Sequence, residues 1–179
     1  EGLRLVGQAF DSNADIQQII YSPDWLISDY GQFLIQKAAN QGIEILEVSP
    51  SVFESLARKD KPQGIAALIK QNWQNSENLF HSKGKNMTTW LAIEGIQNPG
   101  NLGTVLRTCD ATGVEGLILL PPSTDPYDPA AVKASMGAVF TVPIYSINYA
   151  QLASLLDLNS HICVLGTSDK AKQSAFAYQ

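Results

Sequence analysis

The sequence of 179 residues contains little of what metal centres and disulfide-rich folds require, because it has only two cysteines and two histidines. Cys109 and Cys163 each stand in an apolar, periodic setting, so we expect two buried thiols and no disulfide. His81 and His161 lie far apart without the spacing of metal ligands. The sequence therefore predicts no metal site.

Long apolar runs are also missing. The longest runs, such as GLILL at 116–120, fall far below the roughly 20 residues that a membrane helix needs. No charged and apolar leader of the secretory kind opens the chain, so we expect a cytoplasmic protein without a membrane segment. Because the first residue is Glu1 and not Met, we expect the sequence to begin inside a longer gene product.

Basic charge is scarce overall, with 12 Lys and Arg against 17 Asp and Glu, so the net charge of −5 gives no general attraction to nucleic acid. Between residues 58 and 85, however, six basic residues face two acidic ones. They are Arg58, Lys59, Lys61, Lys70, Lys83 and Lys85, against Asp60 and Glu77. This basic segment predicts contacts with phosphate, although a solvated linker surface accounts for it equally well.

Residues 1–70 alternate between helical and strand patterns, which predicts a small α/β domain. The expected helices lie within 1–10, 29–42 and 49–58, the last with Ser49 as N-cap and Pro50 at the first position, and the expected strands within 16–22, 43–49 and 64–70. Residues 71–89 are rich in Asn, Ser and Lys and lack a period, so we expect a linker there.

Residues 90–179 repeat a strand-helix pattern, which predicts a largely parallel sheet with helices on both faces. The expected strands are 90–95, 115–120, 138–145 and 161–167, and the expected helices are 99–112, 129–136 and 148–158.

The stretch NPGNLGTVLRTCDATG, residues 98–113, follows one of these strands and opens a helix. Such a position favours anion binding, because free N–H groups point out of the helix start. A phosphate-binding loop of the nucleoside-triphosphatase type is excluded because no Lys follows Gly103, and the glycine spacing of dinucleotide-binding folds is absent.

Helical spacing separates two faces of this segment. A buried stripe contains Leu102, Val105, Leu106 and Cys109, and another face carries Gly103, Arg107 and Asp110. We expect Arg107 to point to solvent, with the bare backbone at Gly103 open to a bulky partner. The alternative is a weak surface pair of Arg107 with Asp110, with Gly103 serving only helix packing.

Two ordered blocks resemble the signatures of the SpoU-type RNA ribose methyltransferases, the TrmH-like branch of the SPOUT superfamily. Asn101, Gly103 and Arg107 match the first signature. The block VKASMGAVFTVPIY resembles the second, and its matching residues are Ser135, Gly137, Ala138 and Pro143. The segments EGLRLV and KPQGIAALI resemble the family's small N-terminal substrate-binding domain, so the resemblance covers nearly the whole chain.

The resemblance implies a domain organisation and a knotted fold. It implies an N-terminal RNA substrate-binding domain over 1–70, a linker over 71–89 and an incomplete SPOUT methyltransferase domain over 90–179. Family members continue with a third signature, a Gly-Asn-Glu loop and a Ser-Leu-Asn helix start, which completes a trefoil knot and most of the cofactor pocket. This sequence stops at Gln179 before that signature, so we expect the knot-forming part to be absent from this chain.

The resemblance also implies a function, which is the transfer of a methyl group from S-adenosylmethionine to a ribose 2′-hydroxyl of RNA, rRNA more than tRNA, by a homodimer. Arg107 and Asn101 would be catalytic. Gly103, Ser135, Lys59 and Lys61 would bind substrate, and Gly166, Thr167 and Gly137 would bind the cofactor.

The roles of individual residues have alternatives. A guanidinium with a pKa above about 12 is a poor base, so for Arg107 we favour binding of the adjacent phosphate and stabilisation of the developing alkoxide. Asn101 could instead cap the helix start, and Ser135 with Gly137 could form a routine helix end. For the whole chain the alternative is a non-catalytic RNA-binding protein with a degenerate methyltransferase domain, whereas a nucleotide-binding oxidoreductase is disfavoured by the glycine spacing.

Overall fold

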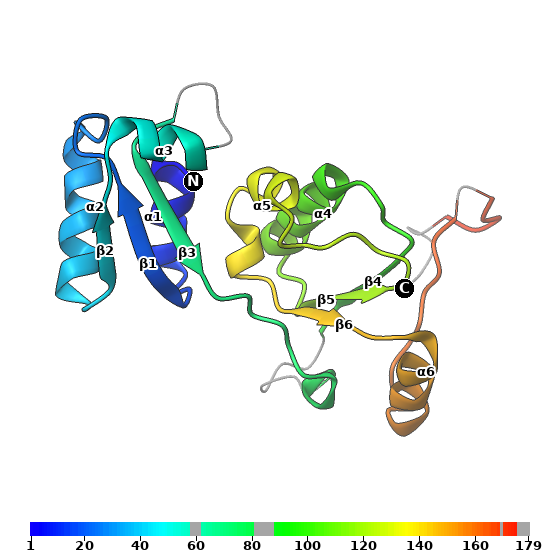
Figure 1. Cartoon of the computed structure of the whole chain (residues 1–179). Coiled ribbons are helices and arrows are strands. Elements are labelled where there is room, and N and C mark those ends of the chain that lie inside the picture. The colour runs from blue at the N-terminus through cyan, green and yellow to red at the C-terminus, as the bar shows by residue number, and fades with distance from the viewer. Residues whose placement is uncertain (58–61, 81–87, 169, 175–179) are drawn as a thin grey trace. The chain divides into compact units, whose positions relative to one another are not determined.

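Two three-stranded sheets organise the chain in the computed structural model, which describes residues 1–57, 62–80, 88–168 and 170–174 (Figure 1). Contacts between Cα atoms divide the chain into two compact units, Glu1–Ile147 and Asn148–Gln179. Both sheets belong to the first unit.

The first sheet and the helices around it include every element that the sequence predicts between residues 1 and 70. The helices are α1 (Leu3–Asp11), α2 (Asp29–Asn40) and α3 (Pro50–Leu56), and the strands are β1 (Ile16–Tyr21), β2 (Glu44–Glu47) and β3 (Ile65–Ile69). The order is β2-β1-β3, with β2 parallel and β3 antiparallel to the central strand. Its core gathers Val6 and Phe10 of α1, Leu34 of α2 and Ile19 of β1.

Side-chain caps explain where two of these helices begin. The Ser28 hydroxyl accepts the Gly31 N–H at the start of α2. The predicted cap of α3 is confirmed, since Ser49 accepts from Val52 N–H and Pro50 takes the first position. Each cap satisfies an N–H group that has no partner within its own helix.

The second sheet has the order β4-β5-β6 and all its pairs are parallel, as the sequence predicts. Its elements are β4 (Trp90–Glu94), α4 (Pro99–Thr112), β5 (Gly116–Leu120), α5 (Pro129–Ser135), the 3₁₀ helix η2 (Ala138–Phe140) and β6 (Ile144–Ser146). Every residue of the central strand β5 is buried, as expected of a strand between two parallel neighbours. Figure 1 shows α4 and α5 side by side on one face of this sheet.

Helix α4 has the predicted bounds because both its ends are capped. The Asn98 side chain accepts the Asn101 N–H, Pro99 follows at the first position, and Gly113 ends the helix at φ 70°. Only a residue that tolerates left-handed backbone suits this last position.

The predicted strand over 138–145 is wrong in its first half. Residues 138–140 form η2, and only 144–146 pair as β6. Met136 at φ 56° and Gly137 at φ 104° reverse the chain after α5, so the following residues turn before they extend. Ala138 and Val139 are therefore buried in a turn and not in a sheet.

The expected linker is ordered in its described first part. Trp73 forms a parallel bridge with Ile144, and the Gln74 N–H donates to the Ile144 carbonyl at 3.0 Å. The short 3₁₀ helix η1 (Ser76–Asn78) follows, and Leu79 is buried. Residues 71–79 are therefore partly anchored by β6 despite their aperiodic sequence.

The second unit contains helix α6 (Tyr149–Leu158), which begins with a reciprocal capping box between Asn148 and Gln151. The predicted strand 161–167 is wrong, since these residues pair with no strand in the described part of the chain. A strand needs a hydrogen-bonding neighbour, and apolar sequence alone does not supply one. The prediction of a buried Cys163 fails with it, because the thiol is exposed, whereas Cys109 in α4 is buried as expected.

Candidate active site

Arg107 lies on the exposed side of α4, which confirms the predicted direction of its side chain. The predicted alternative, a pair with Asp110, is not formed among the described residues, and the Asp110 carboxylate instead accepts a hydrogen bond from the Thr141 hydroxyl at 2.7 Å. Within the described residues Arg107 makes no ion pair and no side-chain hydrogen bond. Its five N–H donors are therefore available to a ligand.

Gly103 lies one turn before Arg107, but the expectation of an open backbone there is wrong. The residue is buried at the crossing of α4 and α5. A Cβ atom at this position would lie 2.5 Å from the Ala131 carbonyl oxygen, 2.6 Å from the Ala134 Cβ and 2.8 Å from the Ser135 nitrogen. Gly103 therefore permits the close approach of two helices, which is the packing alternative that its spacing allowed.

Arg107 opens onto a groove of about 490 Å³ within the first unit. Helix α4 forms one wall of the groove with alternating hydroxyl and charged side chains. Helix α1, about 100 residues earlier in the sequence, supplies Arg4 and Gln8. The other lining residues are Thr104, Thr108, Asp110, Ala111, Ser135, Met136 and Ala138.

The groove combines two guanidinium groups with a single carboxylate, that of Asp110, which already accepts a hydrogen bond. The Thr104 hydroxyl donates to the Gly100 carbonyl at 3.0 Å and the Thr108 hydroxyl to the Thr104 carbonyl at 3.1 Å. Both hydroxyl protons are thus used inside the helix, and the charged donors that remain come from arginine. Such a lining suits an anion.

Asn101 does not line this groove. It stands six residues before Arg107, which on an α-helix is about 9 Å along the axis and about 120° around it. The alternative that Asn101 caps the helix is wrong. The Asn98 side chain is the cap, and its oxygen accepts a hydrogen bond from the Asn101 N–H. The Asn101 side chain is exposed, and its catalytic role stays a prediction.

Ser135 lines the groove but uses its hydroxyl within the helix end. The buried Ser135 hydroxyl donates to the Val132 carbonyl at 2.8 Å and accepts the Gly137 N–H at 3.4 Å. At Gly137 a Cβ atom would lie 2.1 Å from the Gln8 Cγ, so this glycine admits the Gln8 side chain of α1. The turn that ends α5 thus holds α1 at the edge of the groove.

Two family models match the chain. The model described as the SpoU rRNA methylase family matches residues 88–178, and the model described as the MRM3-like substrate-binding domain matches residues 1–67. The chain belongs to the SpoU rRNA methylase family. The Arg107 groove is lined by residues from both matched regions.

Relatives of this chain include proteins named as RNA methyltransferases. A putative TrmH family tRNA/rRNA methyltransferase of Staphylococcus aureus is 34% identical, and the matched part covers 69% of this chain and 50% of the relative's length. The 23S rRNA (guanosine(2553)-2′-O)-methyltransferase RlmP of Bacillus subtilis is 27% identical, and the matched part covers 100% of this chain and 64% of the relative's length. The chain spans about half to two thirds of the length of these relatives.

The solved structure of an rRNA methyltransferase from Sinorhizobium meliloti with bound S-adenosylmethionine has the same fold. Its TM-score is 0.74 at 31% identity, over 88% of this chain and 56% of that one. The SPOUT fold class is therefore confirmed, and S-adenosylmethionine is the cofactor that the SpoU family uses. The described residues show the parallel sheet and its helices but not the knot.

The residues predicted to bind this cofactor belong to both units of the chain. Gly166 and Thr167 are exposed in the second unit, and nothing lies within 4 Å of a Cβ atom built at Gly166. Gly137 lies in the first unit, where the Gln8 side chain covers it. The binding of S-adenosylmethionine by these three residues stays a prediction.

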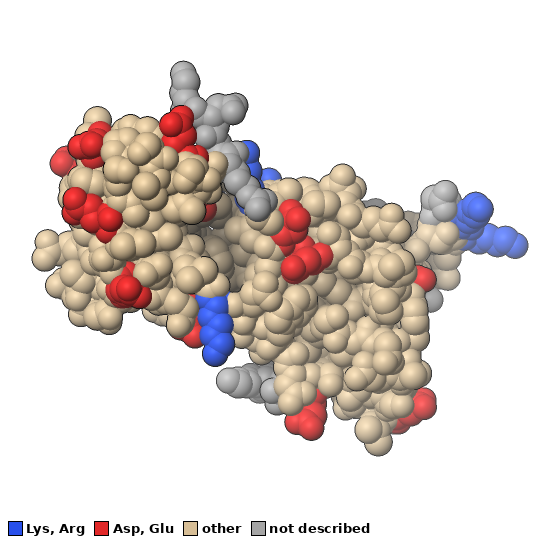
Figure 2. Space-filling model, viewed as in Figure 1, with Lys and Arg blue, Asp and Glu red and all other residues tan. Residues whose placement is uncertain are grey.

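The predicted substrate contacts Lys59 and Lys61 lie outside the described residues, as do Arg58, Lys83 and Lys85 of the basic segment. Among the residues that are described, basic side chains form no continuous surface on the face that Figure 2 shows, and acidic ones are scattered over it. On that face the described positive charge is carried by separate side chains.

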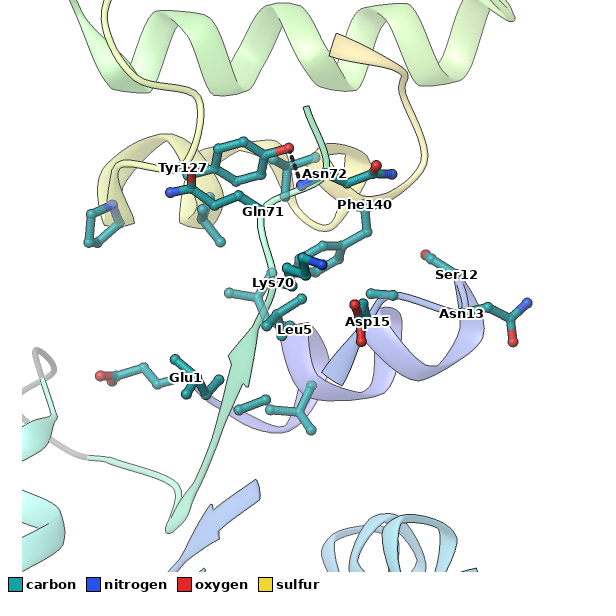
Figure 3. A pocket seen from close by; sticks show the side chains of 18 residues that line it. Glu1, Leu5, Ser12, Asn13, Asp15, Lys70, Gln71, Asn72, Tyr127 and Phe140 are labelled. Carbon is teal, nitrogen blue, oxygen red and sulfur yellow. Dashed lines mark hydrogen bonds between the residues drawn. The ribbon is translucent and has the colours of Figure 1, made fainter. Parts of the chain in front are cut away.

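A second cavity, of about 660 Å³, contains none of the predicted site residues. Parts of α1, α5 and η2 line it together with residues 12–15 and 67–72, and Figure 3 shows the Tyr127 side chain beside Asn72. The Tyr127 hydroxyl accepts the Asn72 N–H at 3.0 Å. Burial raises the pKa of Tyr127, and the bond from Asn72 partly offsets this, so the phenol is neutral near pH 7.

The described residues contain no group of three or more His, Cys, Asp or Glu side chains placed to hold a metal ion. None of their helices combines the length and the apolarity needed to cross a membrane.

Sequence reasoning missed Arg4 and Gln8 as groove residues. Their spacing of four residues on an amphipathic helix indicates only that they share a face. Nothing in the sequence indicates that this face meets the helix of Arg107, because that contact depends on the tertiary packing of α1 against η2.

Proposed function

We propose that this protein takes part in the methylation of a ribose 2′-hydroxyl of rRNA, with S-adenosylmethionine as methyl donor, and that it works as a cytoplasmic homodimer. Membership of the SpoU family supports the reaction class. The B. subtilis relative, named as a 2′-O-methyltransferase of 23S rRNA, supports the ribose hydroxyl and rRNA as the target.

The exposed guanidinium of Arg107, unpaired within the described residues, is the observation on which this proposal rests. A planar guanidinium binds a phosphate oxygen pair with two parallel hydrogen bonds, so Arg107 would hold the nucleotide by its phosphate. The same charge stabilises negative charge that develops on the 2′-oxygen as its proton leaves.

The proposal assigns further roles in RNA binding to five residues, which are Asn101, Gly103, Ser135, Lys59 and Lys61. Lys59 and Lys61 would add phosphate contacts from the basic segment. Gly103 and Ser135 would contribute indirectly, because they let α5 and its last turn pack against the helix that carries Arg107. Asn101 would contact RNA on a neighbouring part of α4.

A second candidate function is RNA binding without catalysis. It is favoured by the groove that contains Arg4 and Arg107, because two guanidinium groups would bind RNA phosphate whether or not a methyl group is transferred. Gly166, Thr167 and Gly137 remain cofactor residues by prediction only.

Replacement of Arg107 by Ala tests the proposed function. Loss of a transition-state contact should lower the rate of methyl transfer about 100-fold or more. The melting temperature should hardly change, because exposed side chains outside special features contribute less than about 0.5 kcal/mol to the free energy of unfolding. The measurement is transfer of radiolabelled methyl from S-adenosylmethionine to rRNA.

The controls for this test are Arg107→Lys and Lys133→Ala. Arg107→Lys keeps the charge but loses the two-pronged geometry, so it should restore little activity. Lys133 is exposed on α5 and does not line the groove, so its removal should leave the rate unchanged. Methyl transfer by Arg107→Ala near the rate of the unaltered protein would refute the role of Arg107. RNA binding without any transfer in the unaltered protein would favour the second function.

A further inference from the structure

Arg4 is the second arginine of the Arg107 groove, and it comes from the N-terminal helix α1. We propose that Arg4 is a positioning residue, which binds a phosphate of the RNA strand whose neighbouring phosphate or ribose Arg107 holds. This inference rests on the proposed function only for the identity of the ligand as RNA. The groove itself stands on the residues that line it.

The position of Arg4 is fixed by packing at both ends of α1. At its start, the Gly2 N–H donates to the Ile65 carbonyl of β3 at 2.9 Å. One turn after Arg4, the Gln8 side chain lies over Gly137, where no Cβ could fit. Phe140 of η2 packs against the core cluster that holds Val6 and Phe10 of the same helix. Helix α1 is thus held against the turn that ends α5.

The side chain of Arg4 is available for binding. It is exposed, and no ion pair or hydrogen bond engages it within the described residues. The one acid of the groove, Asp110, accepts a bond from Thr141. Two unpaired guanidinium groups on one hollow surface repel each other weakly in the free protein, and a bound phosphodiester strand removes that repulsion.

Arginine chemistry favours RNA phosphate over other ligands of this groove. The hydroxyl protons of Thr104 and Thr108 are bound to backbone carbonyls, so the lining offers few free neutral donors to a sugar or a base. Guanidinium groups instead match the paired oxygens of phosphodiesters. An arginine on each of two helices would fix the direction of the strand across the groove, which a single arginine leaves open.

Replacement of Arg4 by Gln tests the proposal in the whole chain. The probe is a fluorescein-labelled single-stranded RNA of 20 nucleotides and mixed sequence, and the readout is anisotropy at several salt concentrations. Loss of one phosphate contact should reduce the slope of log K against log salt by about 0.7 and weaken binding about fourfold near 0.15 M salt.

The matched control is Lys133→Gln, which removes the same charge from an exposed residue outside the groove. Its salt slope should stay within error of the unaltered protein. Arg4→Lys should restore the slope but not the full affinity, because it keeps the charge and loses the planar grip. Equal slopes for Arg4→Gln and Lys133→Gln would overturn the proposal.

A second measurement avoids substitution altogether. Phenylglyoxal modifies exposed arginines, and peptide mass analysis reports Arg4 and Arg107 separately. The same RNA should protect both residues in parallel as its concentration rises. Protection of Arg107 with continued modification of Arg4 would overturn the inference and leave the proposed function intact. Protection of both without methyl transfer would overturn the proposed function and leave the inference intact.

Discussion

Arg107 and Gly103 stand one turn apart on α4, yet their surroundings differ. Arg107 is exposed and unpaired within the described residues, whereas Gly103 is buried under α5. The glycine matters because the two helices approach each other at its backbone, and this approach brings the end of α5 to the groove of Arg107.

Replacement of Gly103 by Ala should therefore destabilise the protein. Ala normally stabilises a helix over Gly by about 1 kcal/mol. Here its Cβ would meet a backbone oxygen of α5 at 2.5 Å, and backbone cannot move aside as a flexible side chain can. We expect a net loss of roughly 1–3 kcal/mol in the free energy of unfolding, measured by chemical denaturation.

Gly100→Ala is the control for this prediction, because it lies on the same helix. A Cβ atom there meets only the Asn98 Oδ1, at 3.1 Å. Its effect should stay within about 1 kcal/mol of the unaltered protein, since propensity and the single contact oppose each other. Equal stability of the Gly103 and Gly100 variants would show that α5 yields at the crossing.

At the scale of elements, the segment after β3 belongs to the second sheet more than its composition suggests. Trp73 bridges Ile144 and contacts the Tyr127 ring edge to face, at 5.1 Å between centroids. The Tyr127 hydroxyl also accepts the Asn72 N–H. The segment that the Asn and Ser content predicts as a linker is thus held at one end by the bridge to Ile144, the aromatic pair and the hydrogen bond from Asn72 to Tyr127.

Tyr127→Phe should isolate that hydrogen bond, because the ring contact with Trp73 remains. Loss of the acceptor should cost about 0.5–1.5 kcal/mol in the free energy of unfolding. The amide proton of Asn72 should also exchange faster with solvent, which hydrogen exchange measures directly.

Tyr145→Phe serves as the comparison. Tyr145 is buried and packs against Trp90, and no described group shares a hydrogen bond with its hydroxyl. It should leave the Asn72 exchange rate unchanged. A similar rate in the two variants would mean that the Tyr127 hydroxyl does not hold the segment.

For the whole molecule, the two compact units differ in how much they bury. The first unit contains both core clusters, whereas α6 of the second buries none of its residues, and Val164 and Leu165 are 67% and 54% exposed. The domain division predicted from the sequence, at residues 71–89, is a different boundary from Ile147 and stays a prediction.

Limited proteolysis with thermolysin should distinguish these boundaries. The exposed residues Val164 and Leu165 offer the first cleavage sites, because their backbone has no strand partner among the described residues. The predicted linker implies a later cut within 71–89, and mass analysis of the fragments gives the order. Early cleavage inside β4, β5 or α4 would contradict both boundaries.

The sequence by itself determined most of the local structure and the exposure of Arg107. Helix α4 has the predicted bounds because Asn98, Pro99 and Gly113 fix its two ends through interactions with residues that are close in sequence. The direction of Arg107 follows from helical period alone, since the apolar stripe beside it must be buried. The SpoU family was likewise evident from two short signatures.

Only the tertiary structure decided what each side chain meets. The sequence could not place Arg4 beside Arg107, nor cover Gly103 with α5, because both contacts join segments that are distant along the chain. Apolar pattern also failed at 138–140 and 161–167, where the backbone turns or has no strand partner among the described residues. Strands depend on a hydrogen-bonding neighbour from elsewhere in the chain, whereas a helix satisfies its own backbone.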